Sequence, residues 1–281
     1  MQVRKLEGAD GFVVVDLEGA SRSVGIVRLA PKVLVDGAEM LARSTTYAFA
    51  TFGVQAGGVS AGVNAKPEDR DAAVTAFCET VSADVGSGAF HFSAGNGIDP
   101  EELAPLGCEP LDAGLGVQGA VTAASAFVGG GKAVVVGGGD WAGRVETWWK
   151  DAGGGDVVEG GFDTEGDVLF VAGKAGVVDD AAAVQIQTRA VVGLTPVPVT
   201  AKAYATLSRA GVTYVPDAVT LAAPLLALID PDGGDPVERV KAKAAELAPA
   251  GVDAWRKMIE QAEAFLSTWQ EKLPYGRPLS S

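Results

Sequence analysis

The only histidine of the 281-residue chain, His91, lies in the segment FHFSAG. An imidazole can give and take a proton near neutral pH, so His91 is the first candidate for general acid or base catalysis. The alternation of a β-strand would place it on one face with Ser93 and Gly95. A packed or half-exposed strand histidine without a catalytic role is the alternative interpretation.

Two hydroxyl side chains, Tyr47 and Ser60, complete the set of catalytic candidates. They lie in LARSTTYAFATFGVQAGGVSAGV, which reads as a helix with aromatic residues followed by a glycine-rich loop, an arrangement that often lines small-molecule pockets. Gly58, Ser60 and Gly62 also match the G-x-S-x-G pattern of serine hydrolases, which needs a strand before the serine, a helix directly after it and a histidine within reach. Here a helix precedes the loop, so we interpret Ser60 as a small loop residue rather than a hydrolase nucleophile.

A second group of candidates could bind a dinucleotide. The apolar run KAVVV, the glycine turn GGGDWAG and the helical pattern RVETWWKDAG follow one another. This turn fits G-x-G-x-x-G/A, in which the missing side chains let a pyrophosphate approach backbone N–H groups at the start of a helix. A glycine turn that only allows close strand–helix packing is the alternative. The candidate cofactor-binding residues of the turn are Gly137, Gly138, Gly139, Asp140, Trp141 and Ala142.

Two acidic residues near this turn bear on cofactor binding. Glu159 ends the next predicted strand, DVVEG, about 20 residues after the glycines, and could hold ribose hydroxyls. Asp140 would place a carboxylate near the pyrophosphate, and capping the helix N-terminus is its alternative role.

Between DVVEG and DVLFVAG there are too few residues for the usual crossover between parallel neighbours. We therefore expect a helix, and with it the wall of the adenine site, to be missing.

The elements that must position these residues form two α/β domains. Strands that alternate with helices over residues 113–236 predict a mostly parallel, Rossmann-like sheet. Helices within residues 237–281 would pack back on the first domain, residues 1–112, or on another subunit, and the ligand cleft would lie between the domains. We expect the first two strands of the first domain to pair antiparallel. Its predicted elements are strands at 11–17, 22–30 and 89–95 and helices at 36–53 and 66–86.

Composition argues against several classes of partner. The net charge of −14 repels nucleic-acid phosphates and anionic lipid surfaces, and the sequence has no basic cluster. No uninterrupted apolar stretch reaches the roughly 18 residues of a transmembrane helix, and the N-terminal MQVRKLEGAD is charged where a signal peptide is apolar. Cys78 and Cys108 lack the spacing of metal ligands. We expect a cytoplasmic protein that binds neither nucleic acid nor membrane.

The order of the motifs resembles the glutamate/leucine/phenylalanine/valine dehydrogenase family. LARSTTYAFATFGVQAGGVSAG is similar to that family's LA-x-x-MTYK-x-A-x-x-G-x-x-x-GGGK-x-G segment, and GVQGAV and VVVGGGDWAG look like the helix and glycine loop of its cofactor domain. GVTYVPD is the most specific element of a longer similar stretch, residues 167–226. The resemblance implies a homo-oligomer whose substrate domain precedes a Rossmann-type domain that binds NAD or NADP.

The family's catalytic residues are not retained at the matching positions. By the resemblance, the lysine that holds the substrate carboxylate corresponds to Ala48, the lysine that activates water to Ser60, and the aspartate that relays protons to Gly95. Pro196 and Leu221 stand where amides would be expected. An amino-acid carboxylate would lack its cationic partner in such a pocket, and burying an uncompensated carboxylate is costly. Ordinary amino-acid deamination is therefore not expected.

Two functional hypotheses follow from the sequence. The first is a divergent NAD(P)-dependent oxidoreductase acting on a small uncharged or non-standard substrate, an imine or a carbonyl compound, with His91 or Tyr47 as proton donor. The second is a catalytically inactive relative that serves as a ligand-binding or scaffold protein.

One further element of the resemblance, GGxR, keeps one glycine and its arginine, Arg28.

Overall fold

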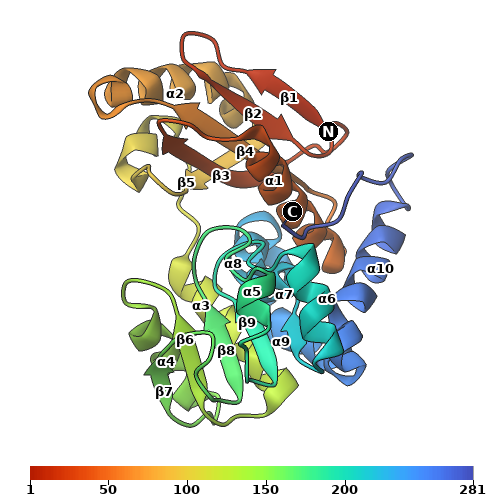
Figure 1. Ribbon diagram of the computed structural model, residues 1–281. Coiled ribbons are helices and arrows are strands. Elements are labelled where there is room, and N and C mark those ends of the chain that lie inside the picture. The colour runs from red at the N-terminus through yellow and green to blue at the C-terminus, as the bar shows by residue number, and fades with distance from the viewer. Residues whose placement is uncertain (281) are drawn as a thin grey trace. The chain divides into compact units, whose positions relative to one another are not determined.

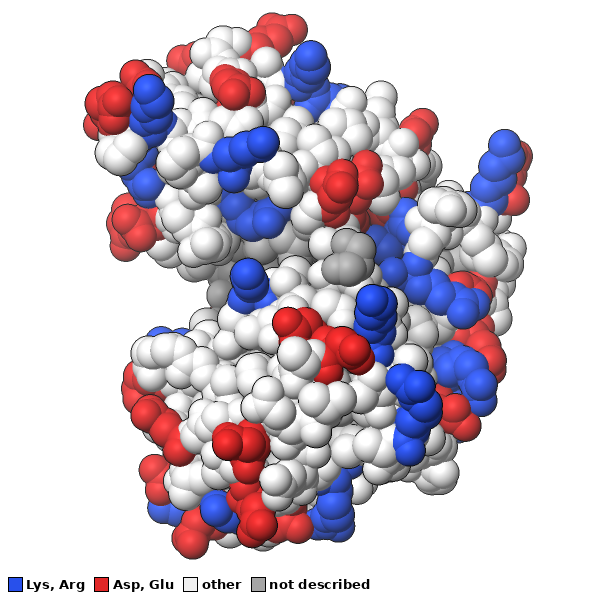
Figure 2. All heavy atoms as spheres, viewed as in Figure 1, with Lys and Arg blue, Asp and Glu red and all other residues white. Residues whose placement is uncertain are grey.

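The computed structural model describes residues 1–280, which divide into two compact units. Both units are α/β, so the predicted fold class is confirmed. Unit 1 comprises residues 1–46, 55–111 and 269–278, and unit 2 comprises the described residues 47–54, 112–268 and 279–280. Acidic and basic side chains are interspersed over the face shown in Figure 2. Within the described chain, no helix combines the length and the apolar character needed to cross a bilayer.

Unit 1 contains a mixed five-stranded sheet in which strand β4 lies between β2 and β3. β2 runs antiparallel to β1 and to β4, whereas β3 runs parallel to β4 and β5. The expected antiparallel pair of β2 and β3 is therefore wrong, because β4 separates the two strands. In sheet order the strands are β1 (Gln2–Lys5), β2 (Gly11–Val15), β4 (Gly57–Asn64), β3 (Ser23–Ala30) and β5 (Phe90–Ala94).

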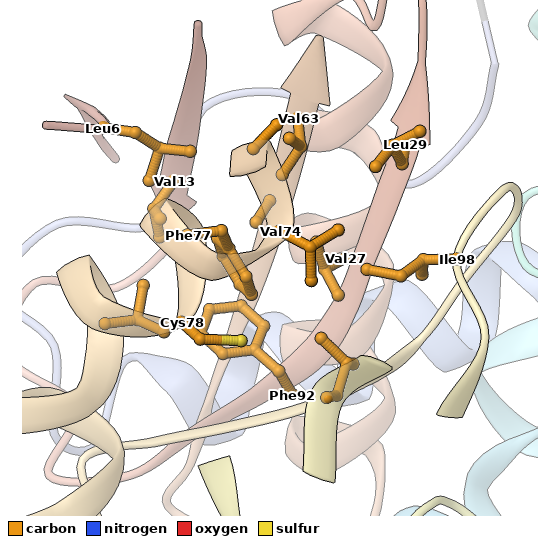
Figure 3. Close-up of a cluster of buried hydrophobic side chains, with 14 of the residues drawn as sticks. Leu6, Val13, Val27, Leu29, Val63, Val74, Phe77, Cys78, Phe92 and Ile98 are labelled. Atoms are coloured by element: carbon orange, nitrogen blue, oxygen red, sulfur yellow. The ribbon is translucent and has the colours of Figure 1, made fainter. Parts of the chain in front are cut away.

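Helices cover both faces of this sheet (Figure 1). Helix α2 (Arg70–Gly86) follows the 3-10 turn Pro67–Asp69, as the proline and the acidic first turn predict, and its Phe77 packs edge-on against Phe92 of β5. Figure 3 shows this apolar cluster, in which side chains of α2 meet those of the strands. Helix α1 (Val35–Thr51) packs on the opposite face, where Ala38 and Ala42 join Phe12 and Val14 of β2.

Unit 2 contains a five-stranded sheet in which every pair is parallel, which confirms the predicted Rossmann-like architecture. Each strand is a short β-branched run buried on both faces except at the edge, as parallel sheets require. In sheet order the strands are β10 (Thr213–Val215), β9 (Ala190–Gly193), β8 (Val168–Val171), β6 (Ala133–Val136) and β7 (Val157–Glu159).

The helices of unit 2 lie on both faces of its sheet. Helix α3 packs against α4, α7, α8 and α9, and α5 packs against α6 (Figure 1). Helices α9 and α10, expected to pack on the first domain or on another subunit, make their contacts within unit 2, whereas residues 269–278 belong to unit 1. The helices are α3 (Ala113–Val128), α4 (Trp141–Asp151), α5 (Asp180–Ala183), α6 (Ala201–Arg209), α7 (Asp217–Thr220), α8 (Ala222–Ile229), α9 (Pro236–Leu247) and α10 (Ala254–Leu266).

Candidate functional site

The parallel sheet of unit 2 has one point at which the order of its strands reverses. β6 and β8 are neighbours, and the chain continues from β6 outward to β7 and from β8 in the other direction to β9. Open α/β sheets bind ligands at such a point, beyond the carboxyl ends of the strands. The glycine turn of residues 137–140 directly follows β6 at this edge, and the turn that begins at Ala172 follows β8.

The structure gives different reasons for the presence of glycine at the three positions of the turn. A Cβ on Gly137 would lie 2.8 Å from the Cβ of Ala172, so this glycine lets the turn pass close to the end of β8. A Cβ on Gly138 or Gly139 would have no described atom within 4 Å. Gly139 has φ +85°, a left-handed conformation that favours glycine. Close packing therefore explains Gly137, and open space lies beside the other two.

Helix α4 begins at Trp141, directly after the turn, as predicted. Asp140 is exposed, and within residues 1–280 its side chain makes no capping hydrogen bond, so the suggested capping role is wrong. The start of α4 thus retains backbone N–H groups that a ligand could use. The helix is fixed at its other end by buried Trp149, whose Nε1 donates to the carbonyl oxygen of Gly131 at 3.0 Å and whose ring packs edge-on against Phe170.

Glu159 lies beside the glycine turn. It ends β7 opposite Val135 of β6, and its side chain is exposed. After it, residues 160–167 return to β8 as a connection that contains neither helix nor strand, with a tight turn closed by a 2.9 Å hydrogen bond from the Gly161 N–H to Thr164 Oγ1. The expectation that this crossover lacks its helix is confirmed.

The turns after β8 and β9 complete this edge, and sequence reasoning missed the residues that shape them. Thr195 Oγ1 accepts from the Gly173 N–H at 3.2 Å and donates to the Gly173 carbonyl oxygen at 2.8 Å. Val197 has φ +53°, which is strained for a β-branched residue, and its N–H donates to Asp217 Oδ2 at 2.7 Å. Burial and the neighbouring Asp217 carboxylate raise the pKa of Tyr214 well above its usual value. The sequence segment GVTYVPD could have pointed to these residues, because it contains both Tyr214 and Asp217.

Ser60 lies in the middle of β4, so the predicted glycine-rich loop is wrong. Its fully buried hydroxyl donates to the carbonyl oxygen of Ile26 at 3.3 Å. A Cβ on Gly58 would overlap the Ala42 carbonyl group of α1, and a Cβ on Gly62 would lie 2.6 Å from the Phe12 ring. Packing therefore explains both glycines of the G-x-S-x-G pattern, and Ser60 lacks the strand-to-helix turn of a nucleophile elbow.

His91 and Ser93 lie on one face of β5, as the alternation predicts. The His91 Nε2 is 2.7 Å from the carbonyl oxygen of Glu109, and Ser93 Oγ accepts from the Leu111 N–H at 3.1 Å. The strand register places Ser60, Ile26 and Ser93 in one row across β4, β3 and β5, with His91 two residues before Ser93 on β5. His91 is half-buried and Ser93 is buried. The structure therefore brings His91 and Ser60 onto the same face of the sheet.

Tyr47, the third catalytic candidate, belongs to the part of α1 that clusters with unit 2. Its side chain is fully buried, and its hydroxyl donates to Glu263 Oε1 of α10 at 3.2 Å. This hydrogen bond ties the end of α1 to α10. Burial and this partner give Tyr47 a structural role that the sequence did not reveal.

Comparison with known proteins agrees with this architecture. No protein-family model and no curated sequence matches the chain. Among solved structures, the hetero-hexameric glutamate dehydrogenase from Thermus thermophilus, in its leucine-bound form, is 19% identical, with a TM-score of 0.73 over 95% of this chain and 86% of that one. L-Tryptophan dehydrogenase from Nostoc punctiforme is 18% identical, with a TM-score of 0.69 over 95% and 96%. These likenesses show that the chain has the fold of amino-acid dehydrogenases.

Proposed function

We propose that the chain is an NAD(P)-dependent oxidoreductase that acts on a small, non-standard or uncharged carbonyl or imine compound. The observation that carries this proposal is the glycine turn at the strand-order reversal of unit 2, with open space beside Gly138 and Gly139 and free N–H groups at the start of α4. Packing alone explains Gly137 but not the other two glycines. The hetero-hexameric dehydrogenase above supports an oligomeric assembly, and we propose that this chain assembles with copies of itself.

The residues at this edge fit a dinucleotide in part. Backbone N–H groups from Gly138 to Ala142 would hold the pyrophosphate, and the exposed Glu159 carboxylate would accept hydrogen bonds from ribose hydroxyls. A carboxylate at that position repels a 2′-phosphate, so we infer that NAD is preferred to NADP. Asp140 opposes pyrophosphate binding unless its exposed side chain turns toward solvent. When bound, the nicotinamide would supply or accept a hydride.

Within unit 1, His91 is our candidate for the residue that holds the accompanying proton. Its Nε2 contacts a carbonyl oxygen, which can only accept, so Nε2 carries the hydrogen and Nδ1 is left to take up or release a proton. Ser60 and Ser93 would add polarity to the same sheet face. By the resemblance described above, Ala48, Ser60 and Gly95 correspond to the family's catalytic lysines and aspartate, and we infer from this that the substrate differs from an ordinary amino acid.

The test is a titration of the protein with NADH and, separately, with NADPH. Trp141 lies at the start of α4, so bound cofactor should quench tryptophan fluorescence, and we expect saturable binding with NADH the tighter ligand. Gly139→Val should abolish this binding, since a bulky side chain would fill the open space where the pyrophosphate would lie. Unchanged affinity in this variant would remove the turn from the cofactor site.

Gly211→Val is the matched control. Gly211 also has a left-handed φ, +77°, and a Cβ at this position would likewise have no described atom within 4 Å, but Gly211 precedes β10 at the amino end of the sheet. The two substitutions therefore impose the same kind of backbone strain, and only the one at Gly139 should affect cofactor affinity.

A second candidate function is a catalytically inactive ligand-binding or scaffold protein. The observation that favours it is the connection between β7 and β8, which has no helix, and by the resemblance the catalytic lysines and aspartate are replaced as well. Absence of fluorescence quenching by either nucleotide at millimolar concentration would favour this function over the oxidoreductase.

A further inference from the structure

Arg28 lies near the carboxyl end of β3, on the sheet face that also carries Ser60 and Ser93. Its side chain is half-buried between two glycines. A Cβ on Gly95 would lie 3.1 Å from Arg28 Cγ, and a Cβ on Gly37 would lie 3.3 Å from Arg28 Nη1. Side chains at either position would crowd the arginine, so the two glycines make room for the Arg28 side chain.

One edge of this guanidinium has no partner. Nε and Nη2 of Arg28 are buried, and among residues 1–280 neither has a hydrogen-bond acceptor. Burial lowers the pKa of Arg28, and no neighbouring carboxylate opposes that effect. Buried charged donors are normally paired, since leaving them unsatisfied destabilises the folded chain.

Two other arginines of the same unit show what this edge binds. Arg43 uses Nε and Nη2 to hold the two oxygens of the Asp16 carboxylate, with Nε–Oδ2 at 2.9 Å and Nη2–Oδ1 at 2.7 Å. Arg70 uses the same two nitrogens to hold the two carboxylate oxygens of Glu102. The parallel N–H groups of this edge match the spacing of carboxylate oxygens. Arg28 presents the same donors without an acid from its own chain.

We propose that Arg28 binds the carboxylate of a small-molecule ligand through its Nε and Nη2 edge. Nη1 is not among the buried unsatisfied atoms, so one end of the group meets solvent, and rotation of the flexible side chain would bring the fork to that opening. The identification of this ligand as the substrate rests on the proposed function, but carboxylate binding does not. Of the two substrate classes named above, the site favours a non-standard acid over an uncharged compound.

The experiment is a titration of the full chain with benzoate at constant ionic strength, without nicotinamide cofactor, following the rise in the unfolding temperature. We expect saturable stabilisation, and a half-saturating concentration raised by about tenfold or more in Arg28→Gln, because a charged bidentate contact is lost. Arg209→Gln removes the same charge from an exposed site in unit 2 and should leave the titration unchanged.

Arg28→Lys tests whether the bidentate geometry of the guanidinium is needed in addition to its positive charge. It keeps the positive charge and should keep the fold, yet it should also weaken benzoate binding by several fold, because a lysine cannot make the bidentate contact. Should Arg28→Gln fail to fold, this variant decides. Equal benzoate affinity in wild type and Arg28→Lys, no saturation in the wild type, or inorganic phosphate binding as tightly as benzoate would each overturn the proposal. Cofactor binding at Gly139 is measured separately, so either proposal can fail alone.

Discussion

At the scale of single residues, the ion pair of Arg43 with Asp16 fixes the C-terminal segment of unit 1. Both side chains are buried, and Arg43 Nη1 also donates to the carbonyl oxygens of Tyr275 and Gly276, the latter at 2.7 Å. Arg43→Met leaves the Asp16 carboxylate buried without this partner. We expect this variant to lose about 3–5 kcal/mol of the free energy of unfolding in urea.

The double variant Asp16→Leu/Arg43→Met is the control for this prediction. It removes both charges, so it should recover most of the lost stability, since an apolar pair of similar volume can replace a buried ion pair. If Arg43→Met alone unfolds at the same urea concentration as the wild type, the pair does not stabilise unit 1.

The residues that sequence patterns identify are those whose role depends on neighbours in the chain. Residues 137–142 lie together because they form one turn, and Glu159 joins them because β6 and β7 are consecutive strands. The partners of Tyr47 and Val197 come from distant segments of the chain. The periodicity of apolar residues and the spacing of motifs carry no information about such long-range contacts, so the sequence alone could not reveal them.

At the scale of elements, the structure corrects the sequence where a strand is rich in glycine. β4 reads GGVSAGVN, a pattern that predicts a loop, because glycine has a low intrinsic preference for strands. The fold requires glycines in this strand, since a Cβ on Gly58 would overlap α1 and a Cβ on Gly62 would lie 2.6 Å from the Phe12 ring. Close approach of neighbouring elements therefore outweighs strand preference here.

We expect the ion pair between Arg70 of α2 and Glu102 of the 3-10 helix Pro100–Leu106 to contribute a stability that depends on pH. Hydrogen bonding to Arg70 lowers the pKa of Glu102 below its usual 4.5, and the folded chain therefore binds fewer protons at acid pH than the unfolded chain. The stability that this carboxylate contributes is complete above the unfolded pKa and is lost as the pH falls through the folded one. Glu102→Gln should thus destabilise the chain at neutral pH, and the difference from wild type should shrink below about pH 4.

Urea unfolding across this pH range measures the effect. Glu101→Gln is the matched control, since it removes a neighbouring exposed carboxylate from the same 3-10 helix and should change little at any pH. A Glu102→Gln deficit that stays constant from neutral to acid pH would contradict a contribution from the ionised carboxylate.

At the scale of the whole molecule, the two units differ in how far the sequence determines them. Unit 2 alternates strands and helices, and in parallel sheets that pattern nearly fixes the topology, so its parallel sheet and its missing crossover can be predicted. Unit 1 inserts β4, a strand distant in sequence, between β2 and β3. Local turn signals could not foresee that insertion, and they do not determine which unit α9 and α10 join.

The short connection of residues 160–167 has a consequence for what the protein recognises in a coenzyme. Without a flanking helix, the adenine ring would remain hydrated and bury little surface, so most of the affinity would come from the rest of the coenzyme. Reduced nicotinamide mononucleotide should therefore bind within about tenfold of NADH in direct calorimetric titrations. A difference in affinity much larger than tenfold would mean that the protein buries the adenine ring at another place. If the two affinities lie within about tenfold of each other, the protein recognises mainly the nicotinamide half of the dinucleotide.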